Sequence, residues 1–467
     1  MPVQKSPDLP PSSEPADKSI KHKSNQAKSR RRLWWGLGLT SVALVSTTAG
    51  ALLAISFASR PLMQSRLAQK QAGVFDSASI SGTGLSFSQL TRPVNVLILG
   101  IDNDDNFDHP QLSTKSTSAQ ALSSCSDTML LVRFLPDTHQ INVLSIPRDT
   151  LVHLPGISIA KIDWANLVGG AALAAQTVSQ QIGEIPIDRY VRLSRNGFIQ
   201  LVDALGGVEV TIPKRMDYVD ETQHLNIHFL PGRQKLNGRH LEEYVRFRHD
   251  KLGDIGRVQR QQEVLKAIMQ TLLQPITIGK LPQILQVAQE NIDTDLSVQE
   301  ILALVQTTLT TDRERNNFLM LPGRFSRPGE YTRSYWIEDG QAAAPILARY
   351  FNASSNPGLS EATSVGSPSR LRVAVANATD QPEAGKRAVA FLRKQGFSHA
   401  YMTDHEVDTS AESALKTQII AQHGNPEDAS AVESALGLGH MQVTATGDVW
   451  SDVTIVIGAD FPTQLNQ

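Results

Sequence analysis

The 467-residue chain contains a single cysteine, Cys125, which excludes an intramolecular disulfide and a zinc finger built on thiolates. It also has almost no net charge, because 44 lysines and arginines oppose 46 acidic residues and leave a formal charge of -2. A uniformly basic nucleic-acid-binding protein is therefore disfavoured. Charged residues make up only 19% and hydrophobic residues 40%, which is too apolar for global disorder and sufficient for packed cores. The length predicts two or three domains.

Basic charge is concentrated at the N-terminus. Residues 1–32 contain eight lysines and arginines against three acidic residues, together with many prolines and serines, which predicts a disordered cytoplasmic tail. Residues 33–58 are uncharged over 26 positions, and about 20 suffice to span a bilayer as a helix. Because basic flanks stay in the cytoplasm, we expect a single-pass anchor in the plasma membrane with the bulk of the chain outside the cytoplasm.

Two alternatives to an anchor exist for the apolar stretch at 33–58, a cleaved signal peptide and a buried core helix. A cleaved signal peptide has a shorter apolar region of about 7–15 residues, and a buried core helix would not normally adjoin a polybasic tail. The basic cluster is better explained by orientation and by contact with anionic lipid than by DNA binding, so no nucleic-acid partner is expected. The polar, Gly- and Ser-containing residues 59–92 predict a stalk outside the membrane.

Strand-like and helix-like segments alternate after the stalk, which predicts a layered α/β domain. The strand-like segments are residues 94–99, 128–135 and 141–146. The helical segments are residues 164–181, 198–205, 257–273 and 296–309, the second closed by Gly206 and Gly207.

A Ser-, Pro-, Gly- and Asn-rich stretch at 352–369 predicts a linker between two domains. The first domain would be residues 93–351, with its core at 93–275. The second, at 370–462, has expected strands at 371–375 and 453–458 and a helix at 384–396 between them, so it is a small α/β domain of ordinary size.

Charged residues follow the expected buried strands. Arg148 and Asp149 come directly after the strand at 141–146, Asp102 follows the first strand, and Asp127 precedes the second. Ligands of α/β sheets bind at the carboxyl ends of strands. Carboxylates placed there could hold Mg²⁺ together with substrate phosphates.

Further cationic side chains lie more than 90 residues later. Arg246 and Arg248 are two residues apart and would share a side in extended backbone, whereas Arg257 and Gln261 are four apart and would share a helix face. Arginine's planar fork suits phosphate oxygens. Surface ion pairing is the alternative for each arginine taken singly, and spacing alone does not bring these residues together.

Taken in order, these segments resemble the LytR-CpsA-Psr family of cell-envelope proteins, and the final Gly458-Ala459-Asp460-Phe461 resembles the C-terminal companion domain of that family. The resembling segments are residues 94–100, 125–132, 144–152, 161–165, 201–210, 231–238, 244–249 and 253–262. The resemblance implies an α-β-α layered catalytic domain, with a smaller α/β domain behind it and a transmembrane helix before it. It also implies an apolar channel for a polyprenyl chain, formed by helices such as 164–181 and 198–205.

The activity that the resemblance implies is phosphotransfer. Such enzymes move a glycopolymer from a polyprenyl-pyrophosphate carrier onto peptidoglycan, and a pyrophosphatase side activity is implied too. The pyrophosphate would be bound by Arg148, Arg246, Arg248, Arg257 and Gln261. The metal, Mg²⁺ with Mn²⁺ as the alternative, would be bound by Asp102 and Asp127. The general base would be Asp102 or Asp149, and the sequence does not choose between them.

One position departs from the family pattern, since Cys125-Ser126-Asp127 stands where relatives usually have Arg-x-Asp. Losing one cation should weaken pyrophosphate binding and reduce activity without abolishing it. A nucleophilic role for Cys125 is disfavoured because no motif pairs it with a histidine. The alternatives to an enzyme are a membrane-tethered lipid- or glycan-binding scaffold and an envelope-related transcriptional attenuator.

Overall fold

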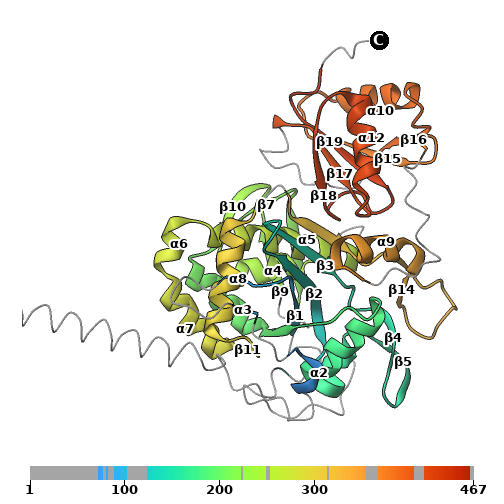
Figure 1. Cartoon of the computed structure of the whole chain (residues 1–467). Coiled ribbons are helices and arrows are strands. Elements are labelled where there is room, and N and C mark those ends of the chain that lie inside the picture. The colour runs from blue at the N-terminus through green and yellow to red at the C-terminus, as the bar shows by residue number, and fades with distance from the viewer. Residues whose placement is uncertain are drawn as a thin grey trace, which may run out of the picture. The chain divides into compact units, whose positions relative to one another are not determined.

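A six-stranded mixed sheet forms the centre of the first domain (Figure 1), in the strand order β11-β6-β1-β2-β3-β12. The computed structural model describes residues 72–76, 80–81, 89–101, 122, 124–221, 225–248, 253–312, 315–353, 367–403 and 415–462. The strands are β1 (Val94–Ile101), β2 (Ser126–Leu135), β3 (Gln140–Ser145), β6 (Arg189–Ser194), β11 (Ile292–Thr294) and β12 (Asn317–Met320). β1 runs antiparallel to β2 and parallel to β6, so the three strands expected from the sequence are confirmed as neighbours at the centre of the sheet.

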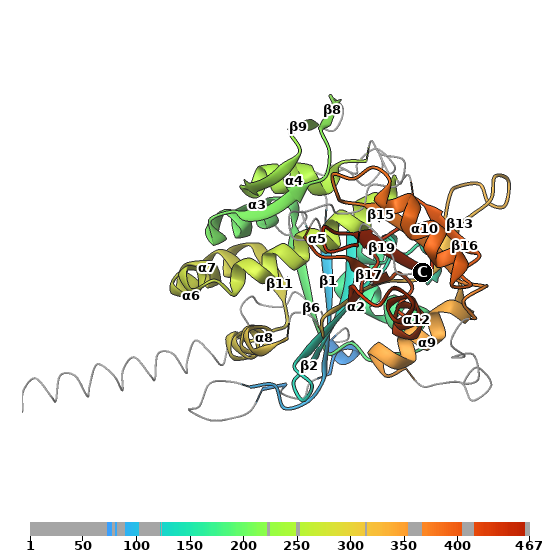
Figure 2. The same cartoon turned by 90° about the horizontal axis from the view of Figure 1, so that it is seen from above.

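Both faces of this sheet are covered by helices, which explains its nearly continuous apolar strands. Leu97 and Leu99 of β1 pack in the core that contains α2 (Trp164–Gln181) and α9 (Gly340–Phe351). Val94 and Val96 point to the opposite face and pack against α8 (Val298–Thr310), which Figure 2 shows on the other side of the sheet from α9. The long helix α5 (Asp254–Leu272) packs on that second face as well. The expected α-β-α layering is confirmed.

Local sequence determines where the helices end or bend. α3 (Arg195–Leu205) is capped at its N-terminus by Ser194, whose hydroxyl accepts a hydrogen bond from the Gly197 amide, and at its C-terminus by Gly206 with φ 88°. That end confirms the predicted glycine stop. α2 has the predicted extent but is kinked, because Gly170 adopts φ 64° and ψ -160°, a conformation open to glycine and strained for other residues.

Shorter elements complete the first domain. Two antiparallel pairs, β7 with β10 and β8 with β9, share a core with α3, α4 and α5. The helices are η1 (Ala72–Val74), α4 (Gly238–Arg246), α6 (Pro275–Gly279) and α7 (Leu281–Asn291). The strands are β4 (Leu151–Leu154), β5 (Ile157–Lys161), β7 (Val208–Ile212), β8 (Met216–Asp220), β9 (Leu225–Phe229), β10 (Gly232–Leu236), β13 (Gly323–Phe325) and β14 (Trp336–Glu338).

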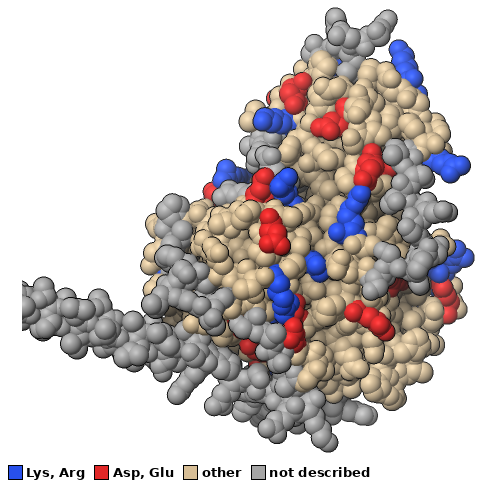
Figure 3. All heavy atoms as spheres, viewed as in Figure 1, with Lys and Arg blue, Asp and Glu red and all other residues tan. Residues whose placement is uncertain are grey.

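The expected C-terminal α/β domain is confirmed. Its five-stranded sheet has the order β16-β15-β19-β17-β18, and two helices share one core with it. The elements are β15 (Arg372–Asn377), α10 (Ala384–Lys394), β16 (His399–Met402), β17 (Gln418–Ala421), α12 (Pro426–Leu436), β18 (His440–Val443) and β19 (Val453–Ile457). On the face drawn in Figure 3, basic and acidic side chains are interspersed, in keeping with the small net charge.

Several segments predicted from the sequence fall outside the part of the chain that the structure describes. The tail at 1–32, the anchor at 33–58 and most of the linker at 352–369 lie outside the described residues. Among the helices that the structure does describe, none combines the length and apolarity needed to cross a membrane. Within the segment expected as a stalk, Phe75, Ile80 and Leu90 are 0–7% exposed and pack in cores of the first domain. The folded domain therefore begins before residue 93, because these apolar side chains complete its cores.

Candidate active site

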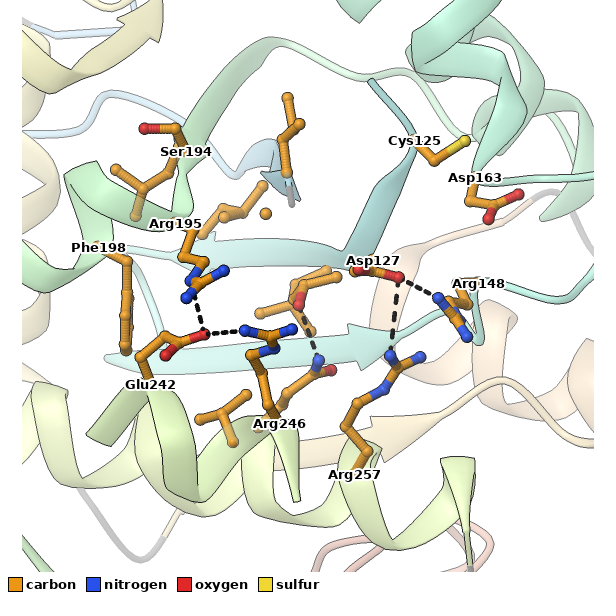
Figure 4. Close-up of a pocket in the computed structure, with 18 of the residues that line it drawn as sticks. Cys125, Asp127, Arg148, Asp163, Ser194, Arg195, Phe198, Glu242, Arg246 and Arg257 are labelled. Atoms are coloured by element: carbon orange, nitrogen blue, oxygen red, sulfur yellow. Dashed lines mark hydrogen bonds and ion pairs between the residues drawn. The ribbon is translucent and has the colours of Figure 1, made fainter. Parts of the chain in front are cut away.

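A cavity of about 560 Å³ opens between the central sheet and helices α3, α4 and α5. One end is charged and the other is apolar. The charged end is lined by Asp127, Arg148, Lys161, Asp163, Arg248 and Arg257, with Cys125 beside them. The apolar end is lined by Ile98, Leu130, Val191, Leu193, Phe198, Leu201, Val264, Leu265, Ile268 and Ile292. Figure 4 shows ten of the lining residues labelled.

Asp127 is the centre of the charged end. Arg148 donates a hydrogen bond to Asp127 Oδ1, and Arg257 Nη1 lies 3.6 Å from the same oxygen (Figure 4). Burial by itself would raise the pKa of Asp127, but the guanidiniums of Arg148, Arg257 and Arg248 outweigh it and lower the pKa below the ordinary value. Three guanidiniums thus lie around one ionised carboxylate, an arrangement that suits an anionic ligand.

Arg148 reaches this position because of the turn after β3. Ile146 donates a backbone hydrogen bond to Met129 of the neighbouring strand, and the Thr150 hydroxyl donates to the Pro147 carbonyl over 2.6 Å. The turn is therefore tied to the sheet on one side and closed on itself on the other. It projects Arg148 from the carboxyl end of β3 into the cavity, as the sequence predicted.

Arg257 and Gln261 confirm the prediction made from their spacing, since both project from α5 into the cavity. Gln261 Nε2 donates a hydrogen bond to the Thr128 hydroxyl over 2.8 Å. The side chain of Arg257 is only 5% exposed, so its guanidinium is held within the site before any ligand binds.

The prediction for Arg246 and Arg248 needs a correction. Extended backbone was expected through this segment, but Arg246 is the last residue of α4, and the chain leaves the helix at Phe247. The helix continues that far because Leu241 and Tyr244 bury one face of it in the core. Both arginines still line the cavity, whereas Phe247 packs in the core and Val245 lines the cavity rather than facing away from it.

The two carboxylates proposed as general base are placed differently. Asp149 is 7% exposed, does not line the cavity, and forms an ion pair of 2.5 Å with Lys161. Asp102 lies outside the described residues, directly after Ile101, which does line the cavity. The site therefore contains Arg148, Arg246, Arg248, Arg257, Gln261 and Asp127 together, without Asp149.

Asp163 was not singled out from the sequence. It precedes α2, lines the charged end and is 6% exposed, and Oδ1 accepts no hydrogen bond from the residues that the structure describes. Burial raises its pKa to about 8, with Asp127 and Asp149 adding to the effect and Arg148 and Lys161 opposing it. The raised pKa favours the protonated form of this side chain at neutral pH. Its position within the segment 161–165 was the only sequence signal.

We expect Asp163→Asn to change the pH dependence of stability. An unfolded aspartate loses its proton near the ordinary pKa of 3.8, whereas the folded chain retains it up to about 8. The contribution of Asp163 to the free energy of unfolding is therefore full below about pH 4 and is lost as the pH rises toward about 8. Asparagine cannot ionise, so the variant should gain stability relative to the parent as the pH rises, on the order of a few kcal/mol by about pH 8. Urea unfolding of both proteins at about pH 5 and pH 8 measures this, and parallel pH profiles would contradict it.

The donor set fits a divalent cation that shares its coordination with a substrate. Among the described residues, no three His, Cys, Asp or Glu side chains are grouped to form a metal cage. Asp127 nevertheless offers an ionised carboxylate inside the cavity. Mg²⁺ is commonly held by one or two carboxylates plus phosphate oxygens, so this donor set suits Mg²⁺ bound with a phosphorylated ligand.

Comparison with known proteins identifies both domains. A family profile described as "LytR_cpsA_psr family" matches residues 63–350, and one described as "LytR cell envelope-related transcriptional attenuator" matches residues 370–461. The chain is 34% identical over 222 residues to the polyisoprenyl-teichoic acid–peptidoglycan teichoic acid transferase TagV of Bacillus subtilis, covering 46% of this chain and 53% of that protein. It is also 34% identical over 251 residues to the transferase TagU of Oceanobacillus iheyensis, covering 52% of this chain and 70% of that protein.

These alignments cover about half of this chain. The chain spans about half the length of several curated relatives that it matches, 53% in three of them. Among solved structures, the crystal structure of B. subtilis TagV aligns with 56% of this chain and 98% of that chain, at 29% identity and a TM-score of 0.47.

Proposed function

Because this chain belongs to the LytR-CpsA-Psr family, we propose that it is a membrane-anchored phosphotransferase that moves a glycopolymer from a polyprenyl-pyrophosphate carrier onto peptidoglycan. The observation that carries the proposal is the two-ended cavity, which joins a cationic cluster to a section lined by apolar side chains. A polyprenyl diphosphate has the matching two parts, an anionic diphosphate for the cationic cluster and an apolar isoprenoid tail for the apolar section. The names of the relatives, which refer to polyisoprenyl-linked teichoic acid and peptidoglycan, support this substrate class.

The described residues account for binding and charge stabilisation. Four arginines that line the cavity would contact oxygens of the diphosphate, and Gln261 would donate a further hydrogen bond there. The arginines are Arg148, Arg246, Arg248 and Arg257. A hydroxyl of peptidoglycan attacks the phosphorus next to the glycan, and polyprenyl phosphate leaves. Phosphoryl transfer depends mainly on positioning and on stabilising spread negative charge, which fixed guanidiniums provide. Mg²⁺ bound by Asp127, with Asp102 as its second proposed ligand, would neutralise further charge on the diphosphate.

The proton of the attacking hydroxyl needs an acceptor. Asp149 is engaged by Lys161 and does not line the cavity. We therefore assign the general base to Asp102, which follows the cavity residue Ile101.

The decisive experiment uses the purified full chain with Mg²⁺, a polyprenyl-pyrophosphate-linked glycan and peptidoglycan. The proposal predicts both release of polyprenyl monophosphate and transfer of labelled glycan to peptidoglycan. Release without peptidoglycan would reveal the pyrophosphatase side activity. Binding of the lipid without release would favour the scaffold, and no binding at all would contradict both.

Topology is part of the proposal, since the acceptor lies outside the cytoplasm. We propose that residues 33–58 anchor the chain, with the N-terminus in the cytoplasm and both folded domains outside. Protease added to intact spheroplasts should digest the folded domains. Their protection would contradict the proposal and favour a cytoplasmic, regulatory role.

Cys125→Arg is expected to increase activity. Cys125 is 8% exposed and lines the charged end beside Asp163 (Figure 4), so a guanidinium there could contact both the diphosphate and Asp163. One added charge-assisted hydrogen bond contributes about 1.5–3 kcal/mol to binding, so KM for the lipid substrate should fall about tenfold or more. Cys125→Met is the matched neutral control. Equal kinetics in the two variants would contradict the prediction.

The helices expected to form a lipid channel contribute unequally. Phe198 and Leu201 of α3 line the apolar end, whereas Leu173 and Ala174 of α2 belong to the core of the sheet. Phe198→Gln should therefore raise KM for a polyprenyl substrate about tenfold, the order of the burial energy of one large apolar side chain. Val168→Gln, on an exposed part of α2, is the control. A thermal melt of each variant shows whether it folds, and loss of the fold in Phe198→Gln alone would rule out a channel role.

A further inference from the structure

The C-terminal domain contacts the first domain at one edge of the central sheet. β12 is the outermost strand at that edge, and Phe318 of β12 forms a parallel bridge with Thr444, which follows β18. Ala445 N donates a hydrogen bond to the Phe318 carbonyl over 2.7 Å. Both folded domains belong to one compact unit of the chain. A segment of the C-terminal domain thus pairs with the edge strand, which protects backbone groups that a sheet edge would otherwise expose.

One side chain of the first domain is committed to this contact. Gln259 of α5 is 8% exposed, and its Nε2 donates hydrogen bonds to the carbonyls of Ala445 over 3.0 Å and Gly447 over 2.7 Å. An amide nitrogen has two N–H donors, so both are used on the C-terminal domain. Within that domain, Gln422 donates to the Ala445 carbonyl and accepts from the Gly447 amide. The carbonyls that Gln259 reaches are therefore held in place by the C-terminal domain itself.

Gln259 lies between two residues of the candidate active site. Arg257 and Gln261 are each two positions away from it, and a step of two residues in an α-helix turns the side chain by about 200°. α5 therefore presents Arg257 and Gln261 to the cavity and presents Gln259 to the C-terminal domain. Any shift of the helix at Gln259 moves both cavity residues with it.

The first turns of α5 are the part of the helix that most needs this support. The helix begins after Gly253, which has no side chain to accept a hydrogen bond from the first turn. Further along α5, Val264 and Ala267 are buried in a core of the first domain. Arg257 and Gln259 both lie in the first two turns. The contact with the C-terminal domain thus holds the segment of α5 that carries Arg257.

We propose that the C-terminal domain is a positioning element of the active site, which acts through Gln259 to hold Arg257 and Gln261 in place. This inference rests on the proposed function. Arg257 Nη1 lies 3.6 Å from Asp127 Oδ1 (Figure 4), and Gln261 Nε2 lies 2.8 Å from the Thr128 hydroxyl oxygen. Misplacing a catalytic group by about 1 Å can cost about 10²-fold in rate. A loosened α5 therefore lowers the rate although every group that touches the substrate is still present.

The test measures kcat for release of polyprenyl monophosphate by variants of the full chain. Gln259→Met keeps the length of the side chain but donates no hydrogen bond, so kcat should fall about tenfold. Gln422→Met, which lies in the C-terminal domain, should lower kcat several-fold because it releases the segment that Gln259 binds. Tyr350→Phe is the matched control, since it removes another hydrogen bond between the domains, the 3.0 Å bond from α9 to the Gly424 carbonyl. It should change kcat less than about twofold.

Double variants show whether the effect passes through Arg257. In an Arg257→Ala background, Gln259→Met should lower kcat no more than about threefold, because only Gln261 is left to be misplaced. A general loss of structure would keep its full cost in that background, and this result would overturn the proposal. An unchanged kcat in Gln259→Met, or equal losses in Gln259→Met and Tyr350→Phe, would also overturn it. If Gln259→Met does not fold, Gln422→Met takes its place in the same comparison.

Hydrogen exchange of the α5 amides measures the contact without turnover. Exchange in the first two turns of α5 should be faster in Gln259→Met and Gln422→Met than in the wild type, and unchanged in Tyr350→Phe. Wild-type protein that releases no polyprenyl monophosphate would contradict the proposed function. Active wild-type protein, with α5 exchange unaltered in both glutamine variants, would contradict the positioning role alone.

Discussion

Arg148→Ala is expected to lower kcat for glycan transfer by about 10²–10³-fold, the loss typical of removing one preorganised donor to developing negative charge. Arg148 is bonded to Asp127 and lies at the charged end of the cavity. Its removal also withdraws one of the cations that lower the pKa of Asp127. Release of polyprenyl monophosphate measures the rate, and titration with inorganic pyrophosphate measures ground-state binding.

The controls for Arg148 separate shape from charge. Arg148→Lys keeps the charge but loses the planar fork, so it should recover part of the activity and not all of it. Arg324→Ala removes an arginine from an exposed ion pair with Glu330 outside the cavity, and should leave kcat unchanged. A fully active Arg148→Ala enzyme would show that the diphosphate is bound elsewhere.

The largest loss of stability is expected from Arg192→Met. Arg192 of β6 pairs with Asp293 of β11, which is 1% exposed, and Arg192 Nε donates to Asp293 Oδ2 over 2.7 Å. Methionine would leave that carboxylate buried without its cation, which costs about 3–5 kcal/mol. Urea unfolding measures the change.

A double variant gives the matched control for this pair. Arg192→Met with Asp293→Leu removes both charges and should recover most of the lost stability, since replacing a buried ion pair by apolar residues is often neutral. Arg192 Nη1 also lies 3.3 Å from Asn166 Oδ1 and 3.4 Å from the Leu122 carbonyl. Leu122 lies shortly before the first residue of β2. We therefore expect the double variant to fold with reduced activity. Equal destabilisation of the single and double variants would contradict the argument.

Elements defined by local pattern were predictable. The strands expected at 94–99 and 141–146 follow from apolar runs, and the structure has them at 94–101 and 140–145. The helix stop at Gly206 follows from the residue type, because glycine readily adopts the left-handed conformation found there. The projection of Arg257 and Gln261 from one helix face follows from their four-residue spacing.

Elements that depend on tertiary packing were not predictable from the sequence. The extended backbone expected at Arg246 is helical, because the core contacts of Leu241 and Tyr244 outweigh the local pattern. Phe75 and Ile80 look like part of a polar stalk, yet they fill gaps in the cores of the first domain. The roles given to Asp102 and to residues 33–58 remain predictions for the experiments above.

By itself, the sequence determined the three central strands and the helices α2, α3, α5 and α8 of the first domain, and it supplied the set of arginines able to meet a phosphate, because backbone periodicity and side-chain chemistry are local properties. Only the tertiary structure decided that Asp149 pairs with Lys161, that burial raises the pKa of Asp163, and that Arg195 of α3 meets Glu242 of α4. Burial and charge pairing depend on which distant segments pack together, and no spacing along the chain encodes that.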